Sequence, residues 1–142
     1  MRVLALSAAA ASLMTLPAMA AGVTVSDGWF RALPANLPSG GYFTLHNGGA
    51  DTVTLTGASS PACAMLMLHK SDEMNGMAGM SDVATIPVAA GDTLKFAPGG
   101  YHLMCMQPTV AMKPGAKVMV TLEFVGGAKI NAPFAVKDAK GN

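Results

Sequence analysis

Short runs of β-favouring residues, separated by glycine, proline and asparagine, constrain this 142-residue chain more than any other feature. Their spacing is typical of sandwiches and barrels built from short strands, and helix signals are almost absent. We therefore predict a single all-β domain with an antiparallel sandwich or barrel architecture. The expected strands lie at 23–25, 42–46, 52–56, 63–69, 83–88, 93–96, 101–107, 117–125 and 129–136.

Two connections between these strands carry further predictions. Asn47-Gly48-Gly49 is a hairpin signal, which predicts that 42–46 pairs with 52–56. Residues 71–81 are rich in Gly and Met, and we interpret them as a loop.

The first twenty residues have the pattern of a secretory signal peptide. Met1-Arg2 is a short positive start, residues 3–13 are apolar, and Ala18-Met19-Ala20 is a small-x-small cleavage pattern. We expect cleavage after Ala20 and an exported β-domain over 21–142. No stretch within 21–142 is long and apolar enough to predict a membrane span.

Composition excludes several classes of function. Hydrophobic residues make up 51% of the chain and charged residues 12%, which argues against a long disordered polypeptide. The formal net charge is +1 and Lys and Arg form no cluster. Binding to nucleic acid through phosphate neutralisation is therefore not expected.

Methionine is unusually abundant. The chain has 12 Met beside 3 His and 2 Cys, and five of the Met lie between positions 65 and 80. Met74, Met77 and Met80 lie in the predicted loop, where exposed thioethers have no role in folding. Met112 and Met119, by contrast, are interpreted as fillers of the core.

Strand alternation brings histidine and methionine together. Residues two apart in a strand point to the same face, so His102 and Met104 share a face. Met65, Met67 and His69 share a face of an earlier strand by the same rule. Thioether sulfur is a soft neutral ligand that selects Cu(I) over Zn²⁺, Mg²⁺ and Ca²⁺. The pattern therefore predicts a neutral Cu(I) site that releases its ion by ligand exchange.

Other functions fit these residues less well. A blue-copper site needs a Cys thiolate among its ligands, but alternation turns Cys105 away from His102. His46 precedes a turn and is interpreted as structural or solvated. No histidine has an acid partner in a hydrolase motif, so an enzyme is not expected. A copper-storage protein and a Met-rich interaction domain that absorbs oxidant remain as alternatives.

The two cysteines leave their pairing open. Export implies an oxidising compartment in which Cys63 and Cys105 are able to pair. Alternation predicts that Cys63 lies on the face of Met65 and that Cys105 faces the core. A disulfide would require a bulge or a register that brings the two together.

Residue spacing is similar to that of a known family. His69, Met80, His102 and Met104 are arranged as H-x10-M-x21-H-x-M, which resembles the motif of the periplasmic copper chaperones called PCuAC, or DUF461. The resemblance continues through Ser26-Asp27-Gly28-Trp29-Phe30-Arg31, Gly41-Tyr42-Phe43-Thr44-Leu45-His46-Asn47, Gly99-Gly100-Tyr101 and Val120-Thr121-Leu122-Glu123-Phe124.

This resemblance implies a cupredoxin-like β-fold and a periplasmic chaperone that binds Cu(I). It implies His69, Met80, His102 and Met104 as ligands, with Met67, Met74 and Met77 as secondary candidates. The implied partner is a copper acceptor, such as a Sco-type protein or the copper site of cytochrome c oxidase. We expect a monomer. Some members carry a His- and Met-rich tail for Cu(II); residues 137–142 contain neither residue, so no such tail site is expected.

Overall fold

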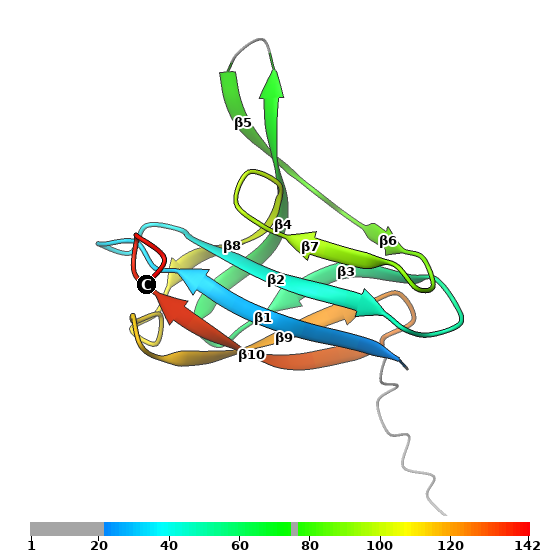
Figure 1. The fold of residues 1–142 in the computed structure, drawn as a ribbon. Helices are drawn as coiled ribbons and strands as arrows, with labels where there is room; N and C mark the ends of the chain where they lie inside the picture. The colour runs from blue at the N-terminus through cyan, green and yellow to red at the C-terminus, as the bar shows by residue number, and fades with distance from the viewer. Residues whose placement is uncertain (1–21, 75–76) are drawn as a thin grey trace, which may run out of the picture.

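The protein consists of ten strands and no regular helix in its described part (Figure 1). A computed structural model describes residues 22–74 and 77–142, with side chains for all of these except 73, 74, 77 and 78. The predicted signal peptide, 1–20, lies outside the described residues. The strands are β1 (Val23–Arg31), β2 (Ser39–Asn47), β3 (Val53–Ser59), β4 (Cys63–Met74), β5 (Met77–Asp82), β6 (Ile86–Val88), β7 (Thr93–Phe96), β8 (Tyr101–Pro108), β9 (Lys117–Phe124) and β10 (Lys129–Lys137).

All ten strands belong to one sheet. Their order is β5-β4-β8-β2-β1-β10-β9-β3-β6, and β7 pairs separately with β2. The sheet curls so that β3, near one end of this order, contacts β4, near the other. The all-β prediction is confirmed. Strands β1 and β10 pair in parallel, however, so the sheet is mixed rather than purely antiparallel.

The predicted hairpin at Asn47-Gly48-Gly49 is wrong. Strand β2 pairs with β1, β7 and β8, whereas β3 pairs with β6 and β9. The fully buried Asn47 side chain explains this crossing. Its amide nitrogen donates to the carbonyls of Asp51 and Val88, at 2.8 and 2.9 Å. These bonds attach the end of β2 to the segment before β3 and to the end of β6, so the chain crosses to β3 instead of folding back on β2.

The predicted loop over 71–81 is also wrong in its extent. Strand β4 continues to Met74, and β5 returns beside it with Met74 paired to Met77. Figure 1 shows this hairpin standing away from the rest of the sheet. The two residues between the paired methionines are Asn75 and Gly76, a dipeptide strongly associated with two-residue hairpins. The loop was predicted from the Gly and Met content of residues 71–81, although Asn75-Gly76 is itself a hairpin signal.

Phenylalanines fill the centre of the molecule. Phe30, Phe43 and Phe134 are buried. The ring centroid of Phe134 lies 5.3 Å from that of Phe30 and 5.7 Å from that of Phe43. Met112 is buried with them, as predicted for a core filler. Met119 is 49% exposed, so the same prediction for that residue is wrong. Within the described residues, no helix is long and apolar enough to cross a membrane.

A disulfide joins Cys63 and Cys105, whose Cα atoms are 5.4 Å apart. Both cysteines are buried, so the prediction that Cys63 shares a face with Met65 is wrong. Ala64 and Met65 are both exposed, which breaks the alternation of β4 between Cys63 and the rest of the strand. Gln107 on β8 has a positive φ of 47°, a further irregularity beside the bond. The disulfide fastens the start of β4 to β8.

Candidate metal centre

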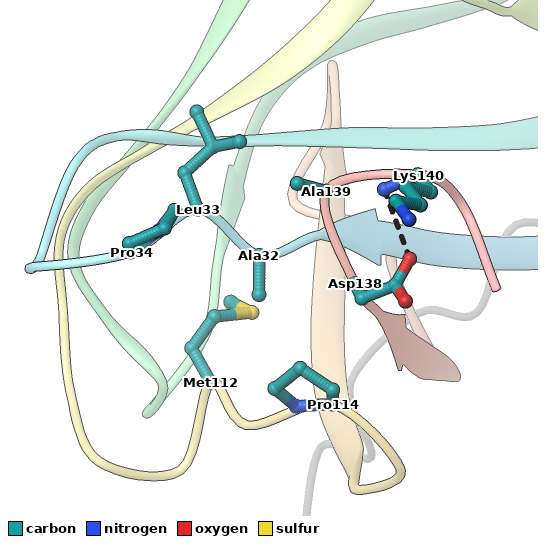
Figure 2. A pocket seen from close by; sticks show the side chains of 8 residues that line it. All are labelled: Ala32, Leu33, Pro34, Met112, Pro114, Asp138, Ala139 and Lys140. Atoms are coloured by element: carbon teal, nitrogen blue, oxygen red, sulfur yellow. Dashed lines mark hydrogen bonds between the residues drawn. The ribbon is translucent and has the colours of Figure 1, made fainter.

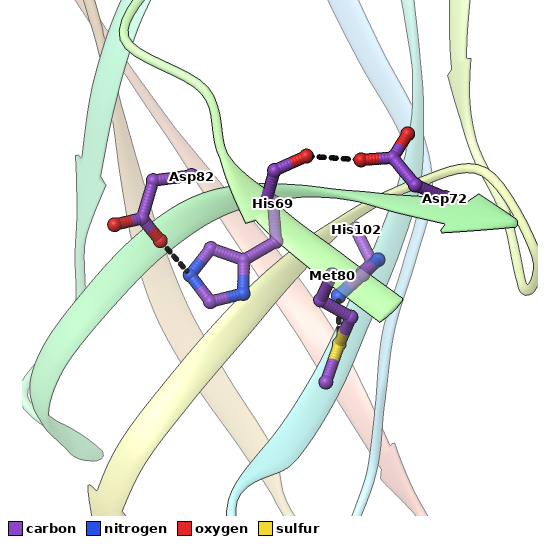
Figure 3. A network of polar contacts seen from close by, with 6 residues as sticks. His69, Asp72, Met80, Asp82 and His102 are labelled. Atoms are coloured by element: carbon purple, nitrogen blue, oxygen red, sulfur yellow. Dashed lines mark hydrogen bonds and ion pairs between the residues drawn. The ribbon is translucent and has the colours of Figure 1, made fainter. Parts of the chain in front are cut away.

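Three neighbouring strands bring the predicted ligands together. Strands β4 and β8 pair so that His69 lies directly opposite His102. On the other side of β4, the hairpin pairs Ser71 with Met80 and His69 with Asp82. Figure 3 shows Met80 extending from β5 toward His102, with His69 beside both. Three of the four predicted ligands therefore cluster where the hairpin meets the sheet.

The buried ring of His102 is held with one nitrogen facing sulfur. Its Nδ1 lies 3.1 Å from the carbonyl oxygen of Gly100, and its Nε2 lies 3.2 Å from Sδ of Met80. A carbonyl only accepts hydrogen bonds, so Nδ1 must carry the hydrogen. In the neutral ring, Nε2 then presents its lone pair toward the Met80 sulfur. This is the tautomer needed for a ligand that binds through Nε2.

His69 is oriented by a carboxylate. Its Nε2 lies 2.7 Å from Oδ1 of Asp82, and the two imidazole rings of His69 and His102 meet edge to face with centroids 5.7 Å apart. Nε2 forms no hydrogen bond in this geometry, but the adjacent negative charge favours a proton on that nitrogen. Nδ1 of His69 is buried and has no hydrogen-bond partner. A buried ring nitrogen without a partner, on an imidazole that packs against His102, is available as a metal ligand.

Met104 reaches the same site from β8. It lines a pocket of about 420 Å³ together with Met80 and His102, and Arg31 and Tyr42 are also among the lining residues. Met104 is half-buried, whereas Met80 is 60% exposed. The pocket thus gives solvent access to two thioethers and one imidazole.

The secondary candidates are placed only in part. Met67 is half-buried and lies directly opposite Met104, two residues along the strands from the His69–His102 pair. The side chains of Met74 and Met77 lie outside the described residues. His46 is exposed and its Nδ1 contacts Oγ1 of Thr93 at 2.9 Å, consistent with the structural role predicted for it.

Sequence reasoning missed the groups that orient the two imidazoles. Gly100 precedes His102 by two residues, and a β-strand pattern does not say where its carbonyl points. Asp82 was within reach of prediction, because a hairpin centred on Asn75-Gly76 places residue 82 opposite residue 69. That inference required residues 71–81 to be interpreted as paired strands.

The donor set suits a soft ion. Within the part of the chain that the structure describes, no group of three or more His, Cys, Asp or Glu side chains forms a potential metal cluster. The protein donors that lie nearest this histidine pair include the thioethers of Met80 and Met104. A second pocket, of about 380 Å³ and shown in Figure 2, has one sulfur, that of Met112, among its lining side chains. It lacks the imidazoles that make the first site chemically specific.

A family model decides which group the chain belongs to. The model named LpqE-like, with the description "Putative lipoprotein LpqE-like", matches residues 23–136. The chain belongs to the LpqE-like family. A relative from Leifsonia xyli subsp. xyli (strain CTCB07), named "Putative lipoprotein Lxx21020", is 34% identical over 132 residues. That alignment covers 92% of this chain and 79% of the relative.

Solved structures with the same fold include copper proteins. Apo-DR1885 from Deinococcus radiodurans is 29% identical, with a TM-score of 0.64 over 96% of this LpqE-like chain and 93% of that one. The CuI-DR1885 structure is 33% identical, with a TM-score of 0.58 over 89% and 83%. The copper-bound PCuAC domain from PmoF2 is 17% identical, with a TM-score of 0.68 over 87% and 99%, and shows likeness of fold alone. The resemblance to the PCuAC family is confirmed.

Proposed function

We propose that this protein is a Cu(I) chaperone that carries one ion on His69, Met80, His102 and Met104. The observation that carries the proposal is the 3.2 Å contact between Nε2 of His102 and Sδ of Met80. The ring of His69 packs against that of His102, and its buried Nδ1 has no hydrogen-bond partner. The fold similarity to a protein solved in a CuI form supports the same ion.

The chemistry of this set suits a carrier rather than an enzyme. Two imidazoles and two thioethers are neutral, so the bound ion keeps its single positive charge near the surface. Soft ligands favour Cu(I), and the 60% exposed Met80 offers a position at which an incoming ligand can replace a thioether. Copper then leaves by ligand exchange without a change in oxidation state.

The proposed acceptor is a protein that binds copper more tightly through thiolate or imidazole ligands. The PCuAC resemblance points to a Sco-type protein or a cytochrome c oxidase copper site. The proposed location is the periplasm, which agrees with the predicted signal peptide, with the disulfide and with the lipoprotein names of the family and its relative. Because site and acceptor lie in one compartment, transfer requires no passage of copper across a membrane.

A competition titration tests the site. The protein is titrated anaerobically with Cu(I) and a chromophoric chelator, with ascorbate as reductant so that the disulfide stays intact. We expect one tight equivalent whose affinity falls by at least a hundredfold in His102→Ala and in Met104→Leu. The matched control, His46→Ala, removes an exposed imidazole outside the site and leaves affinity unchanged. Equal affinities in all four proteins would exclude the proposed ligands.

A further inference from the structure

Four methionines continue the histidine pair along the same two strands. The register places Met67 opposite Met104 and Met65 opposite Met106, in two-residue steps from the His69–His102 pair. Directly opposite residues on one face have Cβ atoms about 4.5–5.5 Å apart, and a two-residue step along a strand is about 6–7 Å. We call Met65, Met67, Met104 and Met106 the thioether ladder.

The ladder does not serve the hydrophobic core. The residues that alternate with it, Leu66, Leu68, Leu103 and Cys105, are buried in the core cluster. Within the described residues, the partly buried apolar side chains that pack against this cluster include no ladder methionine. Met65 is 57% exposed, and the other three are half-buried. Met112, which is part of the core cluster, shows what a packing methionine looks like in this fold.

The ladder has the composition of a soft-metal site. Thioethers are neutral, polarisable ligands that favour Cu(I) and disfavour Zn²⁺ and Ca²⁺. Methionine side chains are unbranched and have three rotatable bonds, so sulfurs on neighbouring strand positions can converge on one ion. Three of them remain after Met104 is assigned to the first site, and they are cross-strand or same-strand neighbours of one another.

We propose that Met65, Met67 and Met106 form a second Cu(I) site, next to the first along β4 and β8. This goes beyond the proposed function, which accounts for one ion. Met104 lies opposite Met67 and one step from the histidine pair, so its sulfur adjoins both sites. Copper would move to the second site as its bonds to His69, His102 and Met80 break and bonds to Met65, Met67 and Met106 form, while Met104 stays bound during the exchange. The ion remains Cu(I), and no electron or proton is transferred.

Stoichiometry tests the second site. Wild-type protein is titrated with Cu(I) under ascorbate, and with Ag(I) as a redox-inert soft probe, and bound metal is counted after desalting. We expect two equivalents for the wild type and one for the variant Met65→Leu/Met67→Leu/Met106→Leu. Met119→Leu, which changes a similarly exposed methionine on β9, should keep two. Two equivalents in the triple variant, or a single equivalent in the wild type, would overturn the second site.

The two proposals fail separately. His102→Ala should lose the equivalent bound at the first site and keep the equivalent bound at the ladder, whereas the triple variant should do the reverse. Loss of both equivalents in the triple variant would place its thioethers in the first site and overturn a separate second one. If no tight equivalent depends on His102 but the ladder equivalent persists, the chaperone site fails and the ladder stands.

A measurement without mutation guards against misfolded variants. In protein labelled at the methionine methyl groups, the first equivalent of Ag(I) should shift the signals of Met80 and Met104. The second should shift those of Met65, Met67 and Met106, with Met119 unmoved. A second equivalent that shifts Met74 and Met77 instead would assign it to the hairpin and contradict the ladder.

Discussion

In each imidazole of the proposed site, a neighbouring oxygen favours a proton on one of the two ring nitrogens. Gly100 accepts from Nδ1 of His102, and Asp82 lies beside Nε2 of His69. The ring nitrogens left for metal therefore differ, Nε2 in one histidine and Nδ1 in the other. Such partners fix the tautomer of a ligating histidine and typically affect metal affinity by about 10- to 100-fold. Gly100 and Asp82 are therefore as much part of the proposed site as its four proposed ligands.

Replacing Asp82 by Asn should weaken Cu(I) binding about tenfold. The Asn side chain is uncharged and its amide is able to donate to Nε2, which would move the imidazole proton to Nδ1 and block that ligand atom. A chelator competition gives the affinity, and ¹⁵N NMR of the His69 ring gives the tautomer. Asp72→Asn is the control, because that carboxylate accepts from Ser81 on the same hairpin and does not contact either imidazole. Equal losses in the two variants would mean that hairpin stability, not the tautomer, sets the affinity.

The sequence led to the four proposed ligands, but not to the groups that orient the two imidazoles. Alternation alone placed His102 and Met104 on one face, and the family spacing supplied Met80. Asp82 depends on the register of β4 with β5, which follows from the sequence only once residues 71–81 are interpreted as a hairpin rather than a loop. The face of β4 on which Cys63 lies was predicted wrongly because side-chain alternation breaks at Ala64 and Met65, directly after it. Side-chain direction is predictable only where the strand is regular.

At the level of elements, the β4–β5 hairpin determines which thioether reaches the histidines. Its pairing puts Met80 opposite Ser71, two residues along the strands from the His69–Asp82 pair. A slip of one residue would turn Met80 to the opposite face. Ser81 donates to Asp72 across the two strands and helps to hold this register. The hairpin is therefore part of the site rather than a loop above it.

Replacing Met80 by Leu should weaken Cu(I) binding by more than tenfold, whereas Met77→Leu should change it little. Leucine keeps the volume and apolar character of methionine but removes the sulfur that contacts His102. The same competition titration measures both variants, and Met74→Leu extends the control along the hairpin. The opposite order of effects would move the fourth ligand from Met80 to another hairpin methionine.

A second element, the crossing from β2 to β3, depends on one side chain. Replacing Asn47 by Ala should destabilise the protein by about 2–4 kcal/mol, because it leaves the carbonyls of Asp51 and Val88 and the amide of Gly49 without their partner. Urea unfolding measures the change, and His46→Ala, at the exposed neighbouring position, is the control. A loss below about 0.5 kcal/mol would show that the crossing does not need this side chain.

For the whole molecule, fold class was easier to predict than strand order. Hydrophobic alternation and turn residues are local, and they identified every strand except β5. Pairing depends on contacts between distant segments, so the parallel β1–β10 pair and the crossing after β2 were not visible in local patterns. The β4–β8 pairing, on which the proposed site depends, joins strands that are separated along the chain by β5, β6 and β7. The disulfide is the covalent link across that separation.

Removing the disulfide should therefore affect stability and copper binding together. Cys63 and Cys105 are 42 residues apart, and closing a loop of that length in the unfolded chain is worth about 4 kcal/mol. Cys63→Ala/Cys105→Ala should lose about that much in urea unfolding, and Cu(I) affinity should fall, since β4 carries His69 and β8 carries His102 and Met104. The double variant is needed for the titration, because freed thiolates in reduced wild type would themselves bind Cu(I). Reduced wild type, unfolded in the absence of copper, is the stability control and should match the variant. Unchanged copper affinity in a variant with the expected loss of stability would show that hydrogen bonding between β4 and β8 alone keeps the ligands in place.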